Sequence, residues 1–438
     1  MNLKNIILMM LSVGILALGG AYFWAVNIPA LEPISKVDST TLDSESVENG
    51  RQLAAVGDCA VCHTKAGGES YAGGLSLPTP FGVLYSTNIT PDLNTGIGNW
   101  SEQAFQRAMQ EGLDREGNHL YPAFPYDHFT KVSEEDIRDI YNYIMSLEPV
   151  EQVNQPNELN FPFSFRPLLA GWKLLFLNKK PFQPNPELND EQNRGAYLVK
   201  GLAHCSACHS PRNVFGAISE KTFFQGGQPE GWYAPALGVH STSAAPWSID
   251  NYLDYLFDGW SEAHGIAAGP MTPVIEHLSD ADEDDIYAIA EYLGTLTPEV
   301  KQEEIDRVVE KVSAYDWVKT ETIGSSTLTL DDGLLNGEQT FVQNCVKCHK
   351  ERISKKQPVS LGLSSVISAP TPENFFHIVI NGIKPPYNSG RQAMESMGIA
   401  VPKDKLVDLA RYVRKRFSSQ SEWTDLEAYL EKSTLSNH

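Results

Sequence analysis

Cysteine is scarce in this sequence and is confined to one pattern. The 438 residues include only six cysteines, and all six lie in three copies of the pentad Cys-x-x-Cys-His. No cysteine is left over for a structural disulfide or a separate catalytic thiol, so a disulfide-stapled fold and ordinary thiol catalysis are both excluded.

Basic residues are also few. Lysine and arginine together number 34 against 55 aspartates and glutamates, which gives a formal net charge of -21 at pH 7. Binding to nucleic acid needs clustered basic side chains, so a nucleic-acid partner is excluded. The 42% of hydrophobic residues is nevertheless enough to build buried cores, and we expect a folded chain. At roughly 150 residues per domain, the length predicts about three domains.

Long uncharged apolar runs are absent except at the amino terminus. After Lys4, the chain runs from Ile6 to Leu31 without a charged residue, which is long enough for a helix that spans a bilayer. We expect residues 1–31 to be an uncleaved membrane anchor with Lys4 on the cytoplasmic side. A cleaved signal peptide ending near Ala30 is the alternative, and both place the rest of the chain outside the cytoplasm.

A second apolar stretch runs from Phe161 to Leu177 and is interrupted by two prolines and an arginine. A continuous spanning helix is therefore excluded there. We expect this stretch to be either a lid over the first of the sites described below or a patch at an interface. Residues 298–332 are interpreted as a charged linker, and the tail after Ser418 supports no specific prediction.

Alignment on the three pentads reveals an internal repeat. Each pentad follows a short predicted helix that begins near a glycine, namely Gly50, Gly195 or Gly337. Downstream of each pentad lies a second predicted helix, with aliphatic residues at positions 1, 4 and 8 of a stripe and a tyrosine at position 7. The three stripes are Ile137/Ile140/Tyr143/Ile144, Ile286/Ile289/Tyr292/Leu293 and Leu406/Leu409/Tyr412/Val413. Two of these helices are expected to begin in the acidic clusters Ser133–Asp136 and Ser279–Asp282.

The pentad itself is the attachment signature of c-type haem. Its two thiols add to the haem vinyl groups, and the adjacent histidine is the proximal ligand of the iron. The three predicted sites are Cys59/Cys62/His63, Cys205/Cys208/His209 and Cys345/Cys348/His349. A thioredoxin-like pair or half of a zinc site also uses Cys-x-x-Cys, but neither explains a histidine after every second cysteine. The sequence therefore predicts three covalently bound haem c groups.

The helix before each pentad and the tyrosine-bearing helix after it resemble the two crossing terminal helices of class I cytochrome c domains. The resemblance implies a mainly α fold, with three tandem domains over residues 45–150, 190–298 and 330–418 that follow the N-terminal transmembrane helix. In such domains the sixth iron ligand lies on a loop before the last helix. There the second repeat has Met271 and the third has Met394, with Met397 as its rival.

The first repeat departs from this pattern, because Phe124 stands where methionine is expected. Phenylalanine cannot ligate iron, so His128 is the predicted substitute, with His119, Met109 and an open site as alternatives. Ligation by two histidines would lower the potential of this haem relative to the His/Met haems. The other histidines have no spacing that recommends them and are interpreted as surface or core residues: His204, His240, His264, His277, His377 and His438.

Further motifs extend the resemblance to almost the whole chain. The first repeat has Thr87–Asp92 and Thr95–Trp100 after its pentad, and the second has Ser210–Asn213 and Gly231–Pro235. With these motifs, residues 48–415 resemble the triple-haem cytochrome subunits of bacterial periplasmic membrane-bound alcohol, aldehyde and gluconate dehydrogenases. The phenylalanine and the histidine of the first repeat are similar to those of members paired with molybdenum hydroxylases.

This resemblance implies an electron-transfer subunit on the periplasmic side of the inner membrane. It would take electrons from a catalytic dehydrogenase that carries a quinone, flavin or molybdenum cofactor and oxidises an alcohol or aldehyde. It would deliver them to ubiquinone or a terminal oxidase of the respiratory chain. The alternative hypothesis is a haem enzyme, such as a peroxidase, with the first haem as an open site.

Overall fold

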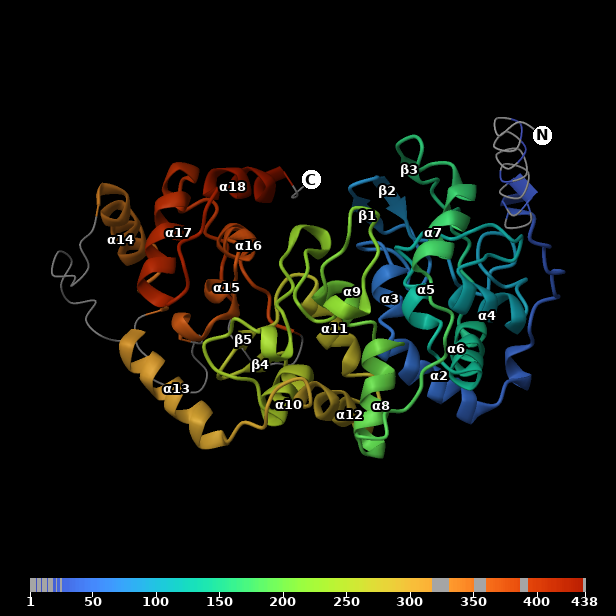
Figure 1. Cartoon of the computed structure of the whole chain (residues 1–438), viewed down its shortest axis with the longest axis horizontal. Coiled ribbons are helices and arrows are strands. Elements are labelled where there is room, and N and C mark those ends of the chain that lie inside the picture. The colour runs from blue at the N-terminus through green and yellow to red at the C-terminus, as the bar shows by residue number, and fades with distance from the viewer. Residues whose placement is uncertain are drawn as a thin grey trace. The chain divides into compact units, whose positions relative to one another are not determined.

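The secondary structure is mainly helical, as predicted, with two small antiparallel sheets (Figure 1). The computed structural model describes residues 26–316, 331–349, 360–386 and 393–435, together with scattered residues between 5 and 23. The chain divides into two compact units. The first comprises Met1–Gln183 with Lys200–His204, and the second comprises Pro184–Val199 with Cys205–His438.

The N-terminal anchor predicted over residues 1–31 lies mostly outside the described residues. Across the described part of the chain, no helix is both long enough and apolar enough to cross a membrane. The last residues of the predicted anchor are described and are fixed to the first unit, because the Leu31 N–H donates to the Arg115 carbonyl at 2.8 Å.

The first unit contains the first pentad between two long helices. Its helices are α2 (Ser44–Val56), α3 (Cys59–Cys62), α4 (Glu102–Glu111), α5 (Tyr126–Phe129), α6 (Glu134–Ser146) and α7 (Leu169–Phe176), with the 3₁₀ turns η1 (Ser39–Thr41) and η2 (Arg166–Leu168). Its sheet has the order β1 (Ser76–Thr79), β2 (Gly82–Tyr85) and β3 (Glu158–Leu159), in which Ser76 pairs with Tyr85 and Val83 with Glu158. This sheet joins the chain after the first pentad to the segment that follows α6.

The second unit contains the second and third pentads. Its first half has α8 (Asp190–Lys200), α9 (Ser206–His209), η3 (Glu220–Thr222), η4 (Pro229–Gly231), η5 (Gly238–His240), α10 (Ile249–Asp258), α11 (Met271–Leu278) and α12 (Glu283–Gly294), with a hairpin of β4 (Trp260–Ser261) and β5 (Gly265–Ile266). Its second half has α13 (Gln302–Asp316), α14 (Asp332–Asn344), η6 (Leu361–Leu363), α15 (Ser365–Ser368), α16 (Glu373–Asn381), α17 (Lys403–Phe417) and α18 (Leu426–Leu435).

The predicted pair of crossing helices is present in all three repeats. In each repeat the glycine of the first helix presses on the backbone of the last helix, four residues before the tyrosine. A Cβ atom on Gly50 would collide with the Asp139 carbonyl and lie 2.9 Å from the Tyr143 Cβ. The equivalent atom on Gly195 would lie 2.8 Å from the Tyr292 Cβ, and on Gly337 it would lie 2.6 Å from the Tyr412 Cβ. Glycine is therefore required at each crossing, because no side chain fits there.

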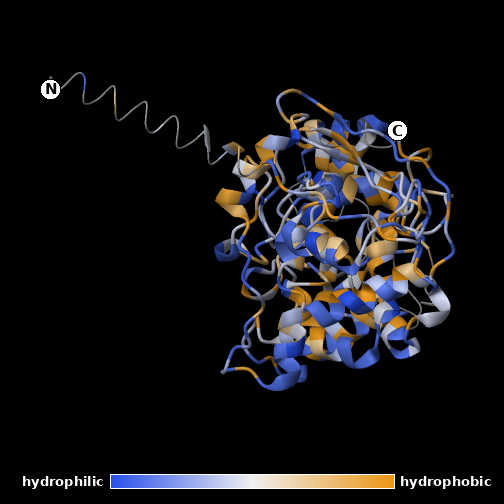
Figure 2. Ribbon diagram, turned by 90° about the vertical axis from the view of Figure 1, so that its right-hand side faces the viewer, coloured by the Kyte–Doolittle hydropathy of each residue, from blue (hydrophilic) through white to orange (hydrophobic). Residues whose placement is uncertain are grey.

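The predicted apolar stripes of the last helices form the cores of the repeats. The aliphatic residues of all three stripes are buried, and so are Tyr292 and Tyr412, while Tyr143 is half-buried. Figure 2 shows hydrophobic and hydrophilic residues alternating around the helices, as expected for helices with one buried face.

Three sequence expectations differ from the structure. The helix expected to begin at Ser279 begins at Glu283, because Ser279 ends α11 and Asp282 accepts the capping hydrogen bond from the Asp284 N–H. The charged linker contains α13, whose Ile305 is 1% exposed and packs with buried Leu363. The polar tail contains α18, whose apolar residues complete the core of the third repeat. In both segments a few apolar residues suffice for docking, and that depends on partners distant in the chain.

Candidate haem sites

The first pentad forms one short helical turn, α3, with His63 at its end. The His63 N–H donates to the Cys59 carbonyl at 3.1 Å, and the His63 carbonyl accepts from the Gly73 N–H at 2.6 Å. The ring Nδ1 of His63 lies 2.7 Å from the Thr87 carbonyl oxygen. The imidazole is thus held at its backbone and at one ring nitrogen.

The second pentad repeats this arrangement around α9. The His209 N–H donates to the Cys205 carbonyl at 3.0 Å, and the His209 carbonyl accepts from the Gly226 N–H at 2.9 Å. The ring Nδ1 lies 2.6 Å from the Pro235 carbonyl oxygen. Sequence reasoning missed Thr87 and Pro235 as partners, although both belong to the motifs noted after the pentads.

These carbonyls determine which ring nitrogen is free to bind iron. A carbonyl oxygen only accepts, so Nδ1 of His63 and of His209 must donate a proton, which leaves the Nε2 lone pair available. Burial lowers the pKa of both histidines, against a smaller opposing effect of the hydrogen bonds to Thr87 and Pro235. Burial also lowers the pKa of His349 to about 4. All three rings are therefore neutral at pH 7, the form that coordinates haem iron.

The cysteines of the pentads are poor nucleophilic thiolates. Burial raises the pKa of Cys59 to about 12, with further contributions from Asp58 and Cys62. Burial, followed by the neighbouring cysteine, likewise raises the pKa of Cys205 and of Cys345 to about 12. Within the described residues, no group of three His, Cys, Asp or Glu side chains could hold a metal ion. The donor set fits covalent haem attachment better than a reactive redox pair or a zinc site.

The third pentad is described only as far as His349, whose N–H donates to the Cys345 carbonyl at 2.9 Å. Both candidate sixth ligands, Met394 and Met397, are half-buried against the core cluster that also contacts Cys345. Met394 exchanges two backbone hydrogen bonds with Ile383, at 2.8 and 3.0 Å, whereas the Met397 N–H donates to the Val379 carbonyl at 2.8 Å. Packing alone therefore leaves Met394 and Met397 as alternatives.

Substitution separates these two methionines. We expect Met394→Leu to lower the potential of one haem and to open its iron to carbon monoxide, because leucine keeps the packing volume but lacks the thioether. Met397→Leu serves as the matched control and should leave both properties unchanged. A spectroelectrochemical titration of the two variants measures this, and the reverse outcome would assign the ligand to Met397.

The predicted sixth ligand of the second repeat, Met271, is the first residue of α11 and is half-buried. The loop before it packs on Trp232, since a Cβ atom on Gly269 would lie 2.6 Å from the Trp232 ring. Three residues further on, Pro235 holds the ring of His209. One segment, Gly231–Pro235, thus supports both the proximal histidine and the predicted distal loop.

The same segment contacts the third repeat. The ring of Trp232 stacks on His377 of α16 at a centroid distance of 4.7 Å, and Nε2 of His377 lies 3.1 Å from the Gly231 carbonyl oxygen. The Asn374 amide accepts from the Tyr233 N–H and donates to the Tyr233 carbonyl, both at 2.8 Å. His377 is therefore a buried residue that holds the second and third repeats together.

The environment of the first predicted sixth ligand is closed. His128 lies in α5 and is 2% exposed, with Nδ1 at 3.0 Å from the Asp127 carboxylate and its ring centroid 6.4 Å from that of His204. Phe124 packs edge-on against Phe129 in the same turn. The alternatives His119 and Met109 are also buried. The identity of this ligand stays a prediction.

Two family models match the chain. The model described as "Cytochrome c" matches residues 47–148, and the model described as "Cytochrome C oxidase, cbb3-type, subunit III" matches residues 333–413. The first match covers the first pentad with its two crossing helices, and the second covers the third pentad with its helices.

Curated relatives cover most of the chain. It is 42% identical to a subunit of the nicotinate dehydrogenase of Pseudomonas putida over 89% of its own length, but it spans only 32% of that longer protein. It is 34% identical to the gluconate 2-dehydrogenase cytochrome c subunit of Pantoea cypripedii, over 84% of this chain and 85% of that protein. It is 31% identical to the cytochrome c subunit of the quinone alcohol dehydrogenase of Gluconacetobacter polyoxogenes, over 92% of this chain and 87% of that protein.

Proposed function

Because the chain belongs to the family of cytochrome c subunits of dehydrogenases, we propose that it carries three haem c groups and relays electrons from a catalytic dehydrogenase. The observation that carries this proposal is the repeated geometry at His63 and His209, where a backbone carbonyl orients a neutral imidazole beside two thiols. Haem, when bound, supplies a one-electron redox centre. The acceptor we propose is ubiquinone or a terminal oxidase.

The residues of this chain orient, tune and insulate the haems. The carbonyls of Thr87 and Pro235 hold the proximal rings and increase their basicity as ligands. Cys59, Cys62, Cys205, Cys208, Cys345 and Cys348 supply the thioether bonds of the three attachments. We retain Met271, Met394 and His128 as the proposed sixth ligands. Irons with two protein ligands offer no coordination position to a substrate, which suits transfer of electrons rather than catalysis.

The proposed donor is a separate dehydrogenase polypeptide that carries a quinone, flavin or molybdenum cofactor. The relatives named as subunits of nicotinate, gluconate and alcohol dehydrogenases support such a partner. An electron relay does not need to recognise the substrate oxidised upstream. One cytochrome architecture can therefore serve several donor chemistries.

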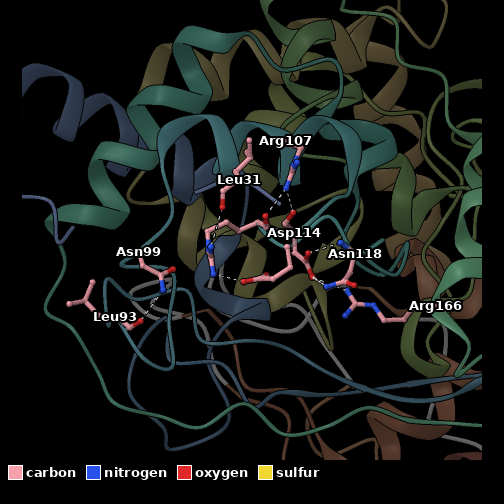
Figure 3. Close-up of polar contacts among 9 residues, drawn as sticks. Leu31, Leu93, Asn99, Arg107, Asp114, Asn118 and Arg166 are labelled. Atoms are coloured by element: carbon pink, nitrogen blue, oxygen red, sulfur yellow. Dashed lines mark hydrogen bonds and ion pairs between the residues drawn. The ribbon is translucent and has the colours of Figure 1, made fainter. Parts of the chain in front are cut away.

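We further propose that residues 1–31 anchor the protein in the inner membrane, with its haem domains on the periplasmic side. The uncharged run from Ile6 to Leu31 supports an anchor. Its last residues are held tightly: the Arg107 guanidinium donates to the Pro29 carbonyl at 2.9 Å and the Arg115 guanidinium donates to the Leu31 carbonyl at 3.1 Å (Figure 3). Such clamping would hold the first unit close to the bilayer.

Haem stoichiometry tests the proposal. In a host that matures c-type cytochromes, we expect an alkaline pyridine haemochrome equivalent to three haems per chain, because each pentad has both thiols and a histidine. Replacing both cysteines of one pentad by alanine should remove one equivalent. A mass equal to the bare polypeptide would contradict the proposal.

Carbon monoxide binding separates electron relay from the haem-enzyme alternative. A relay with six-coordinate irons should leave the reduced protein largely unreactive with carbon monoxide. Stoichiometric binding at one haem, accompanied by turnover of hydrogen peroxide, would favour a peroxidase at the first haem instead. The separate variants His128→Ala and Met109→Ala would then identify which side chain closes that iron in the wild type.

A further inference from the structure

Helix α7 has its polarity reversed. One face turns toward the first unit: the Trp172 ring lies edge-on to Tyr126 at 6.0 Å, and the Lys173 ammonium donates to the carbonyls of Glu111 and Gly112 at 2.7 and 2.5 Å. Burial lowers the pKa of Lys173 to about 7. The helix thus buries its only cation against the protein.

The opposite face of this segment is apolar and exposed. Leu168, Leu174 and Leu175 are 48%, 86% and 74% exposed. These residues fall on one side of the helix because α-helical residues advance by 100° each. A helix at a protein–water boundary places its leucines inside and its lysine outside. The observed arrangement suits a helix whose outer surroundings are apolar.

Three phenylalanines continue this surface. Phe161, Phe163 and Phe165 are 88%, 43% and 52% exposed. The segment is held in place, because the Phe163 ring packs on Phe81 at 4.6 Å and the Tyr121 hydroxyl donates to the Phe163 carbonyl at 3.1 Å. We call Phe161, Phe163, Phe165, Leu168, Leu174 and Leu175 the apolar face. Its exposure is built into the fold of the first unit.

The apolar face is tied to the loop that also holds the end of the N-terminal apolar run. The Arg166 guanidinium lies 3.4 Å from the Asp114 carboxylate and donates to the His119 carbonyl at 2.9 Å. The next residue of that loop, Arg115, donates to the Leu31 carbonyl, as Figure 3 shows. The loop therefore joins the base of the apolar face to the exit of the N-terminal segment.

We propose that the apolar face lies in the interfacial layer of a phospholipid bilayer, beside the N-terminal segment. This inference rests on the membrane anchoring put forward above. The eight residues of α7 are too few to span a bilayer but suit an in-plane position. Residues 159–186 contain four basic side chains and no acidic one in a chain of net charge -21, so this segment is the one suited to anionic headgroups. The bilayer would cover side chains that water now contacts.

Photocrosslinking to lipid tests the proposal. The full-length holoprotein is reconstituted in vesicles of phosphatidylethanolamine and phosphatidylglycerol that contain a trace of phospholipid with a diazirine near the headgroup. Peptide mapping is expected to locate crosslinks in residues 161–176 as well as in the N-terminal segment. The double variant Leu174→Glu with Leu175→Glu should reduce crosslinking of residues 161–176 about tenfold and leave the N-terminal crosslinks intact.

The matched control is Val153→Glu, which introduces the same charge at another exposed apolar residue of the first unit, 75% exposed. This variant should keep the wild-type crosslinks, and an unchanged haem spectrum in all variants shows that they fold. The proposal is overturned if residues 161–176 crosslink no more than residues 152–157. It is also overturned if the double variant crosslinks like the wild type, or if those residues become protected only when a catalytic dehydrogenase is added. Crosslinks at 161–176 without any at the N-terminus would overturn the anchor and support the apolar face.

Discussion

Replacing Gly50 with alanine is expected to destabilise the first cytochrome domain by about 3 kcal/mol or more, at the upper end of what overpacking costs. The added methyl group would collide with the Asp139 carbonyl of α6, and backbone cannot move aside as a flexible side chain can. Alanine gains only about 1 kcal/mol over glycine as a helix former, so the collision dominates. The expected result is a lower thermal midpoint and preferential loss of the haem attached through Cys59 and Cys62.

The matched control for this substitution is Gly171→Ala. Gly171 is also a helical glycine of the first unit, but a Cβ atom there would meet nothing within 4 Å. Its stability should stay the same or rise by up to about 1 kcal/mol. Thermal unfolding followed by the haem absorbance measures both variants. Equal midpoints for Gly50→Ala and the wild type would refute the close helix crossing.

Met271→Leu is expected to lower the potential of the second haem by on the order of 100 mV, within the range of about 0.8 V that axial ligands control. Leucine has nearly the volume of methionine, so the fold should persist while the iron loses its thioether. One haem in three should then bind carbon monoxide. A lower potential in the middle of the relay should also slow electron delivery to the acceptor.

The control for Met271 is Met145→Leu, in which an equally conservative change is made in α6. Met145 is 2% exposed and belongs to the core of the first repeat. This variant should keep all three potentials and stay unreactive with carbon monoxide. A redox titration monitored by visible absorbance compares the two proteins. If Met271→Leu titrates like Met145→Leu, Met271 is core filler and another residue ligates the second iron.

Local patterns were the most readable part of the sequence. Each pentad places all three attachment groups within five residues, so no tertiary contact is needed to recognise it. The helix pairs were also readable, since a glycine at the crossing and a tyrosine in the stripe recur in register in all three repeats. Amphipathic periodicity alone predicted which residues of α6, α12 and α17 are buried.

Partners distant in the chain were not readable. The carbonyl that orients His63 lies 24 residues away at Thr87, and the carbonyl that orients His209 lies 26 residues away at Pro235. Any residue has a carbonyl, so side-chain identity does not mark such a partner. The docking of His377 on Trp232 was missed for a similar reason, because the two residues are in different repeats.

The sequence by itself determined the chemistry of this protein: three haem attachment sites, each between two amphipathic helices, because thioether attachment and helical periodicity depend on residues close together in the chain. Only the tertiary structure decided how the imidazoles are oriented, that α13 and α18 dock, and that α7 turns Lys173 inward and its leucines outward. These features depend on which surfaces meet when the chain folds. Spacing along the sequence does not specify that meeting, since burial is a property of the folded chain.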